Sequence, residues 1–532
     1  MSREPEQALT PARRLLTRVL LLASLAMGLS RGRSLLPRTP QDQQLITAGS
    51  GAMGAVAALI AEGAVALLSR ALGRRRLVAA AVLGAAGGAA HLAERRGMAR
   101  GNAAAAATGV QVLGAAALGG ELGVGAWGRI PRRQRNELTN RATTAAIAAA
   151  SAAGALRSKL AEPSDLIKAT ILYDRLPTVS GGEGSLLPLQ HIDREGRKFL
   201  GCAPSAERIA EVIGEDAQDP IRVFAGIGSA ETPQERAALA VAELERLGGL
   251  ERSRIVVYCP AGTGLVNPVA PEAEEYLSRG DVASIVVQYS QKRSLRARKD
   301  LEVAQETFGL VLEELGKAIG GGNGKRPEIV VYGESLGAWV IAEAIAAGGA
   351  ASIRGLGIDR GAIIGVPFPA RLKLRRVRDA GEPLPEGVAI HSSLDELVML
   401  TPEEKERIRY LVYTHPEDPV GNFEGTSMAW RQPGWLRKGS RHPRIPGGMR
   451  WYPGITYLQL LFDLKNGTGS TGVFSAYGHD YRLELPALLR IAWGHPDVSD
   501  RQLRGIEDAT VASAEEQAQR EDRARVGVRT AR

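Results

Sequence analysis

A serine flanked by glycines is the strongest chemical signal in this sequence. Gly333-Glu334-Ser335-Leu336-Gly337 fits G-x-S-x-G, with a β-branched run at 327–332 before it and an apolar helical pattern at 338–345 after it. Strand, pentapeptide and helix in this order form a nucleophile elbow. The turn strains the backbone of the serine, and neighbours without a Cβ atom relieve the crowding. We therefore predict that Ser335 is a nucleophile, the alternative being a tight turn without chemistry.

A second match to the same pattern offers an internal comparison. Ser30 is the centre of the match at 28–32, which ends an apolar segment, lies beside arginines and has no strand before it. An elbow needs a strand to present its serine above the edge of a sheet. We therefore predict no catalytic role for Ser30.

A serine nucleophile needs an orienting acid and a base, which follow it in the chain in the order Ser, acid, His. Asp418 comes just after a late predicted strand at 408–414, where the orienting carboxylate belongs. We choose Asp418, with Glu417 and Asp395 as reserves. The alternative is that Asp418 is a turn residue before Pro419.

The base must be a histidine that follows the acid. His442, His479 and His495 all do so. His479 stands shortly before a predicted helix at 485–493, the usual place for the base, so we choose His479. The alternative is that His479 is a surface-loop histidine without a catalytic role.

Backbone N–H groups complete the predicted site. The N–H of Leu336, just after the nucleophile, would meet the oxyanion of a tetrahedral intermediate. A second N–H would come from the glycine-rich turn at 261–264, and Gly262 is our candidate within it. The turn at 226–228 competes for this role.

The fold around these residues is predicted to be α/β. From about residue 220 the chain alternates β-branched runs with helical patterns. The predicted strands are 221–226, 254–259, 283–289, 327–332, 361–366 and 408–414. Strands separated by helices indicate a mostly parallel sheet with right-handed crossovers, flanked by helices, with the chemistry at the carboxyl ends of the strands.

Four motifs together resemble a known family. They are Gly333-Glu334-Ser335-Leu336-Gly337, His415-Pro416-Glu417-Asp418-Pro419-Val420, Met449-Arg450-Trp451-Tyr452-Pro453 and Gly478-His479-Asp480-Tyr481. They are similar to the bacterial membrane-linked α/β-hydrolase family over about residues 165–498, and more loosely in the apolar N-terminus. The resemblance implies an α/β-hydrolase fold, a serine hydrolase activity and an N-terminal multi-span region. It implies no particular substrate.

The first 160 residues are rich in Ala, Gly, Leu and Arg. Stretches without Asp, Glu, Lys or Arg run over 19–30, 43–61, 77–92, 101–120 and 142–156. Several are shorter than the roughly 20 residues of a typical spanning helix, but flanking arginines can snorkel to lengthen them. We predict a multi-span transmembrane region at 1–160; the alternative is a soluble, Ala-rich helical bundle.

The net charge of +9 is attributed to this region. Arginines stand in the short connections between apolar segments, where they fix membrane orientation, so the surplus does not indicate nucleic-acid binding. With five spans the N-terminus would be cytoplasmic, and the large domain would lie outside the cytoplasm. We therefore expect a multi-pass protein of the cell membrane.

The remaining segments divide as follows. Residues 161–219 read as a linker and entry segment, 220–498 as the catalytic domain and 499–532 as a charged, partly disordered tail. An aromatic insertion lies between acid and base, with three of the six tryptophans, and reads as a membrane-facing lid or as an ordinary core. Cys202 and Cys259 either pair or are small buried residues. No His/Cys cluster indicates a metal or cofactor.

Three functions fit these residues. The first is hydrolysis of a small-molecule or lipid ester through an acyl-enzyme. The second is transfer of the acyl group to an alcohol, which differs only in how well the site excludes water. The third is a membrane protein whose hydrolase-like domain binds a ligand without catalysis.

Overall fold

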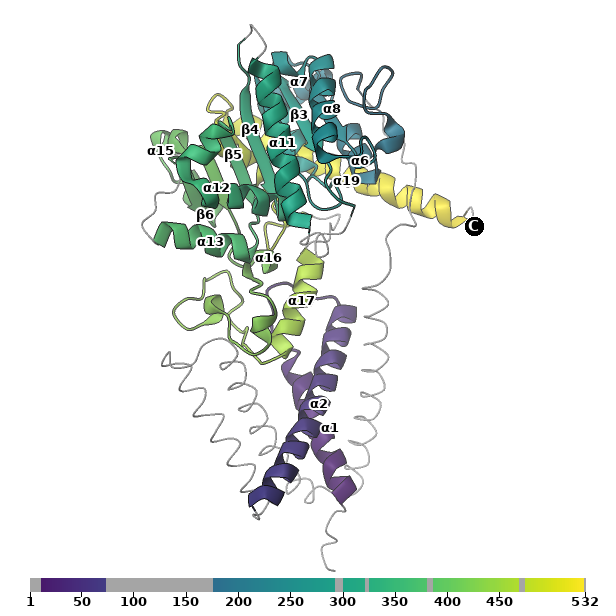
Figure 1. The fold of residues 1–532 in the computed structure, drawn as a ribbon, viewed down its shortest axis with the longest axis vertical. Coiled ribbons are helices and arrows are strands. Elements are labelled where there is room, and N and C mark those ends of the chain that lie inside the picture. The colour runs from purple at the N-terminus through teal and green to yellow at the C-terminus, as the bar shows by residue number, and fades with distance from the viewer. Residues whose placement is uncertain are drawn as a thin grey trace, which may run out of the picture. The chain divides into compact units, whose positions relative to one another are not determined.

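The computed structural model describes residues 11–72, 176–291, 300–320, 325–379, 386–467 and 474–530 (Figure 1). The chain forms two compact units. The hairpin unit contains Met1–Ser164 and Phe423–Thr468, and the sheet unit contains Asp165–Asn422 and Gly469–Arg532. The predicted spans at 77–92, 101–120 and 142–156 lie outside the described residues.

A parallel sheet with strand order β1-β3-β2-β4-β5-β7-β6 organises the sheet unit. Its strands are β1 (Ile221–Ala225), β2 (Arg254–Cys259), β3 (Val282–Val287), β4 (Glu328–Glu334), β5 (Arg360–Ile364), β6 (Val388–His391) and β7 (Tyr410–Tyr413). Most residues of the central strands are buried, as expected when helices cover both faces. The prediction of a mostly parallel α/β sheet is confirmed.

Helices cover the two faces of the sheet in separate groups, because successive strand residues point to opposite faces. One core forms under α8 (Pro233–Arg246), α11 (Leu301–Gly320), α12 (Leu336–Gly355) and α13 (Phe368–Asp379). The other forms under α6 (Arg194–Gly201), α7 (Ala206–Ile213), α9 (Val269–Leu277), α18 (Leu485–Ala492) and α19 (Asp500–Thr530). In β2, for example, Ile255 and Val257 enter the first core and Val256 and Tyr258 the second.

Short helices fill the connections. They are η1 (Leu189–His191), η2 (Gly249–Glu251), α14 (Leu394–Val398), α15 (Pro402–Arg407) and α16 (Pro419–Asn422). Capping sets where α8 begins: Thr232 and Glu235 form a capping box before it, with Pro233 in the first turn.

Two segments outside 220–498 belong to the sheet unit. Arg222 of β1 forms a buried ion pair with Glu275 of α9 at 2.6 Å and donates to the carbonyl of Phe199, which fastens α6 to the sheet. At the other end, the tail predicted to be charged and partly disordered contains helix α19. Its Ile506 and Ala509 are buried, because the charged composition hides an apolar face that packs on α7 and α9.

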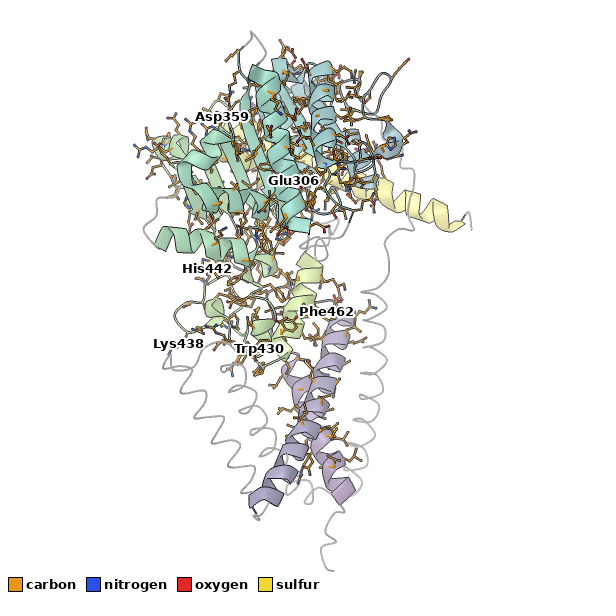
Figure 2. The ribbon with its side chains drawn as sticks, viewed as in Figure 1. Glu306, Asp359, Trp430, Lys438, His442 and Phe462 are labelled. Atoms are coloured by element: carbon orange, nitrogen blue, oxygen red, sulfur yellow. The ribbon has the colours of Figure 1, made fainter. Side chains whose placement is uncertain are left out.

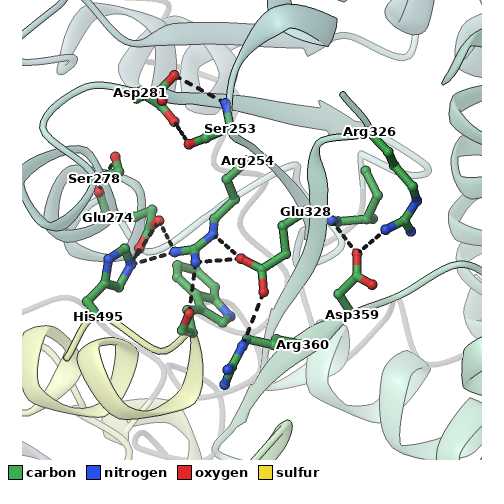
Figure 3. Close-up of polar contacts among 12 residues, drawn as sticks. Ser253, Arg254, Glu274, Ser278, Asp281, Arg326, Glu328, Asp359, Arg360 and His495 are labelled. Carbon is green, nitrogen blue, oxygen red and sulfur yellow. Dashed lines mark hydrogen bonds and ion pairs between the residues drawn. The ribbon is translucent and has the colours of Figure 1, made fainter. Parts of the chain in front are cut away.

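A buried polar network ties the amino ends of three strands together (Figure 3). Arg254, the first residue of β2, donates to Glu328 of β4 at 2.6 Å and to Glu274 of α9 at 2.7 Å. Arg360 of β5 donates to the same Glu328 at 3.1 Å. His495 joins the network 2.9 Å from Glu274. These residues are at the opposite ends of the strands from the elbow, so His495 is a structural residue here.

The hairpin unit pairs α1 (Pro11–Leu29) with α2 (Pro40–Leu72). Small residues let the two helices approach closely, since a Cβ added to Gly54 would lie 2.5 Å from the carbonyl oxygen of Leu22. Arg18 of α1 and Glu62 of α2 form an ion pair. Within the described residues, one helix segment, Pro40–Glu62, is long and apolar enough to cross a membrane.

The aromatic insertion packs against this hairpin, far away in the sequence. It contains η4 (Thr426–Ala429), η5 (Gly434–Leu436) and α17 (Ile455–Gly467). Asp463 of α17 accepts hydrogen bonds from the hydroxyl of Ser34 and the N–H of Leu35, the latter at 3.0 Å. Leu35 is buried among Met428, Leu436 and Leu460. The insertion thus shares an apolar core with the α1–α2 connection, and its role as a membrane-facing lid stays a prediction.

Ser30, the second match to G-x-S-x-G, lies at the end of α1. Its side chain is buried, and its hydroxyl donates to the carbonyl of Met27 at 2.7 Å. A helix end with no strand before it cannot present a nucleophile above a sheet, so the geometry agrees with the absence of a predicted role.

Candidate active site

Ser335 occupies the sharp turn between β4 and α12. β4 ends at Glu334 and α12 begins at Leu336, so the serine alone makes the reversal. Its φ of +58° lies in the left-handed region that residues with side chains rarely adopt. The N–H of Ser335 donates to the carbonyl of Ile364 on β5 at 3.1 Å, which holds the strained residue at the carboxyl end of the sheet.

The two glycines of the elbow are sterically required. A Cβ added to Gly333 would lie 2.5 Å from the carbonyl carbon of Gly337. A Cβ added to Gly337 would lie 2.0 Å from the carbonyl oxygen of Cys259, the last residue of the neighbouring strand β2. The start of α12 therefore lies directly on the end of β2, and only hydrogen atoms fit at both positions.

Asp418 and His479 meet as the sequence predicts for an acid and a base. The Nδ1 atom of His479 is 2.8 Å from Oδ2 of Asp418, and both side chains are buried. Asp418 also accepts from the hydroxyl of Tyr481 at 2.6 Å and, through Oδ1, from the N–H of Val420 at 2.7 Å. Burial alone would raise the pKa of Asp418, but His479 and the other donors outweigh it and lower that pKa.

The His479–Asp418 pair lies at the same edge of the sheet as the elbow. Gly365 follows Ile364, the residue that binds the N–H of Ser335, and its φ is +61°. A Cβ added to Gly365 would lie 2.7 Å from Cε1 of His479. Burial would lower the pKa of His479, but Asp418, and more weakly Glu334 beside the serine, raise it.

The reserve acids are placed differently. Glu417 is buried, and its carboxylate accepts from the N–H of Gly478 at 3.4 Å. Asp395 is exposed on α14, beyond the edge strand β6. His442 belongs to the hairpin unit. Asp418 and His479 are the predicted acid and base that the structure pairs.

Sheet order separates the two turns that compete for the oxyanion. Cys259 of β2 pairs with Gly333 of β4, so the turn with Gly262 begins beside the elbow. The turn at 226–228 follows β1, which β3 and β2 separate from β4. Leu336 is the first residue of α12, where backbone N–H groups point out of a helix. The placement therefore favours Gly262 over the competing turn.

Comparison with known proteins agrees with this architecture. A family model described as the alpha/beta-hydrolase family matches residues 221–504, which include the elbow, Asp418 and His479. The chain belongs to the alpha/beta-hydrolase family. No curated protein and no solved structure matches it. Because the family match starts at β1, the membrane-linked part of the resemblance stays a prediction.

A second histidine–carboxylate pair lies next to the first. The sequence patterns did not predict it. His415 is fully buried, with Nδ1 2.9 Å from the carbonyl oxygen of Gly478 and Nε2 2.7 Å from Glu484. Because a carbonyl only accepts, Nδ1 of His415 is the donor in its contact with Gly478. Tyr413 also donates to Glu484, at 2.8 Å.

Contacts of His415 hold together the two loops that carry Asp418 and His479. The N–H of His415 donates to the hydroxyl oxygen of Tyr481 at 3.2 Å, which leaves the hydroxyl proton of Tyr481 for Asp418. The rings of His415 and Tyr481 stack with centroids 4.4 Å apart. His415 also holds Gly478, the residue before His479. In the sequence, these contacts are indicated only by the positions of His415 and Tyr481, which are a few residues from Asp418 and His479, respectively.

The described residues contain no group of three or more His, Cys, Asp or Glu side chains that could hold a metal ion. Cys202 and Cys259 are both free, Cys202 partly buried and Cys259 buried, so the structure favours the prediction of unpaired residues over that of a disulfide. Burial raises the pKa of the Cys259 thiol to about 12, which makes it a poor nucleophile despite its place at the end of β2.

We predict that Gly337→Ala prevents the elbow from forming, because its Cβ would overlap the carbonyl oxygen of Cys259. Thermal unfolding should show a loss of more than about 3 kcal/mol or no folded protein. Gly309→Ala in α11 is the matched control: nothing lies within 4 Å of its added Cβ, and the change should stabilise by about 0.5–1 kcal/mol. Equal stability of the two variants would contradict the described elbow.

Proposed function

We propose that this protein is a membrane-anchored serine hydrolase that cleaves carboxylic esters through an acyl-enzyme. One observation carries the proposal: a buried His479–Asp418 pair lies at the same sheet edge as a serine strained into the left-handed region. Family membership supports a hydrolase-like activity. Strain at a polar residue of this kind is retained where it serves function.

The proposed reaction uses the same three residues in both of its halves, acylation and deacylation. Nε2 of His479 takes the proton of Ser335 as Oγ attacks the ester carbonyl carbon, while Asp418 holds the proton on Nδ1. The bond to the alcohol then breaks, and the imidazolium returns the proton to that leaving group. Water repeats the sequence on the acyl-enzyme and releases the acid. The N–H groups of Leu336 and Gly262 would stabilise the oxyanion in both halves.

The membrane setting is the second part of the proposal. Pro40–Glu62 supports an anchor by its length and apolar composition. Val56, Leu59 and Ile60 on this helix expose 54%, 51% and 53% of their surface, which suits contact with lipid more than with water. A multi-pass region at 1–160 and a catalytic domain outside the cytoplasm stay predictions. A small-molecule or lipid ester is the proposed substrate.

Three substitutions test the catalytic residues. Ser335→Ala and His479→Ala should each lower kcat/KM on a short nitrophenyl ester by at least about 1,000-fold, because triad members act as a unit. Asp418→Asn should cost somewhat less. His442→Ala is the control and should stay within about twofold of the parent. Turnover by Ser335→Ala within about tenfold of the parent would remove the proposed nucleophile, and full loss in His442→Ala would mean a different base.

The pH dependence of kcat/KM tests the charge arrangement. The catalytic form needs neutral His479, whose pKa is raised by Asp418, so activity should fall as the pH drops through a value above the ordinary histidine pKa of about 6.5. Asp418→Asn removes the raising charge and should move this acid limb to lower pH, at a lower maximal rate. Asp395→Asn, a change at an exposed carboxylate, should leave the limb in place. An unmoved limb in Asp418→Asn would contradict the pairing.

A further inference from the structure

The hairpin unit carries an excess of basic residues around one end of its helices. Residues 30–39, which connect α1 to α2, and the insertion at 423–467 contain ten basic residues but only two acidic ones, Glu424 and Asp463. The basic residues are Arg31, Arg33, Arg38, Arg431, Arg437, Lys438, Arg441, Arg444, Arg450 and Lys465. Such an excess in two distant segments matters only if the fold brings the segments together.

The contacts of the unit do bring them together. Gln459 of the insertion donates to the carbonyl of Ser30 at 3.0 Å, and Asp463 accepts from the N–H of Leu35 at 3.0 Å. The side chain of Arg33 lies 3.4 Å from the position of a Cβ on Gly448, in the basic part of the insertion. The connection and the insertion therefore pack together along the first half of α2, where Gly454 of the insertion lies beside Met53.

The acidic residues of this region form hydrogen bonds and ion pairs with other groups of the hairpin unit. Asp463 is buried with Ser34 and Leu35, and burial raises its pKa to about 6. Glu424 accepts from the N–H of Gly434 at 3.0 Å, and its pKa is raised by burial. Asp42, at the start of α2, is buried and bound to Lys465 at 3.0 Å. Asp463 and Asp42 are thus held inside the unit, and Glu424, which is partly exposed, lies near Arg431 and Arg437. Basic residues still outnumber acidic ones on the exposed surface.

The exposed basic side chains are Arg31, Arg33, Arg431, Arg437, Lys438 and Arg450, and we call them the basic surface. Three tryptophans accompany them. Trp430 is 38% exposed, while Trp435 and Trp451 are partly buried. Trp430 and Lys438, both on the insertion, are labelled in Figure 2. Tryptophan and arginine beside an apolar helix are typical of the membrane–water interface.

We propose that the basic surface binds the headgroups of anionic phospholipids. The inference rests on the membrane part of the proposed function, because the surface borders Pro40–Glu62, the segment able to cross a bilayer. Gly454 donates to the carbonyl of Ala429, next to Trp430, and lies beside Met53 of α2. The guanidinium groups would therefore meet the phosphate layer where α2 extends beyond the insertion. Arginine pairs bidentately with phosphate oxygens, and each basic residue near an anionic membrane strengthens the attraction to it.

A lipid titration of the full-length protein in neutral detergent tests this. The probes are two short-chain lipids used as monomers, dihexanoylphosphatidylglycerol and dihexanoylphosphatidylcholine, and tryptophan fluorescence reports binding. We expect the phosphatidylglycerol to bind at least tenfold more tightly at low salt, with the preference shrinking as salt rises. Arg431→Gln, Arg437→Gln and Lys438→Gln combined should remove at least tenfold of that preference.

The matched control changes three exposed basic residues of the sheet unit, Lys325→Gln, Arg407→Gln and Arg409→Gln, and should keep the preference. Equal binding of the two lipids, an unchanged preference in the first triple variant, or equal loss in both would overturn the proposal. So would duplex DNA bound through the same three residues without a preference for anionic lipid. Ser335→Ala should show the parent's lipid preference, so failure of the hydrolase proposal and failure of this one give different results.

Discussion

The close approach of the elbow to strand β2 is the constraint on which the rest of the site depends. Gly337 lies against the carbonyl of Cys259, and Ser335 is bound through its N–H to Ile364 of β5. These two contacts fix the serine between its neighbouring strands and force φ to +58°. A parallel sheet with β4 at its centre supplies both neighbours, and the buried network around Arg254 holds the other ends of the same strands. The fold can therefore be understood as a support for one strained residue.

Two loops complete the site, and they depend on each other. Asp418 comes from the loop after β7 and His479 from the loop before α18. Tyr481 and His415 form hydrogen bonds that join these two loops. Contacts from the other loop therefore help to position both Asp418 and His479. Asp418 receives three hydrogen bonds, which keeps its carboxylate ionised although it is fully buried.

The elbow could be predicted because strand, turn and helix are consecutive in the sequence. Asp418 and His479 followed from chain order, although they are 61 residues apart. The pair of His415 and Glu484 could not be predicted, since it exists only where the sheet brings two loops together. Nor could the contact of Asp463 with Ser34, 429 residues away, or helix α19, whose charged composition hides an apolar face. Sequence patterns report local structure, and these features are long-range packing.

Covalent labelling is the direct test of whether Ser335 is an activated nucleophile. The full-length protein is treated with a fluorophosphonate probe, digested and analysed by peptide mass spectrometry. We expect one phosphonyl adduct, on Ser335 in the peptide that contains the elbow, and much slower formation of this adduct in the His479→Ala protein. A folded protein that stays unlabelled, or an adduct that maps to another residue, would contradict the claim.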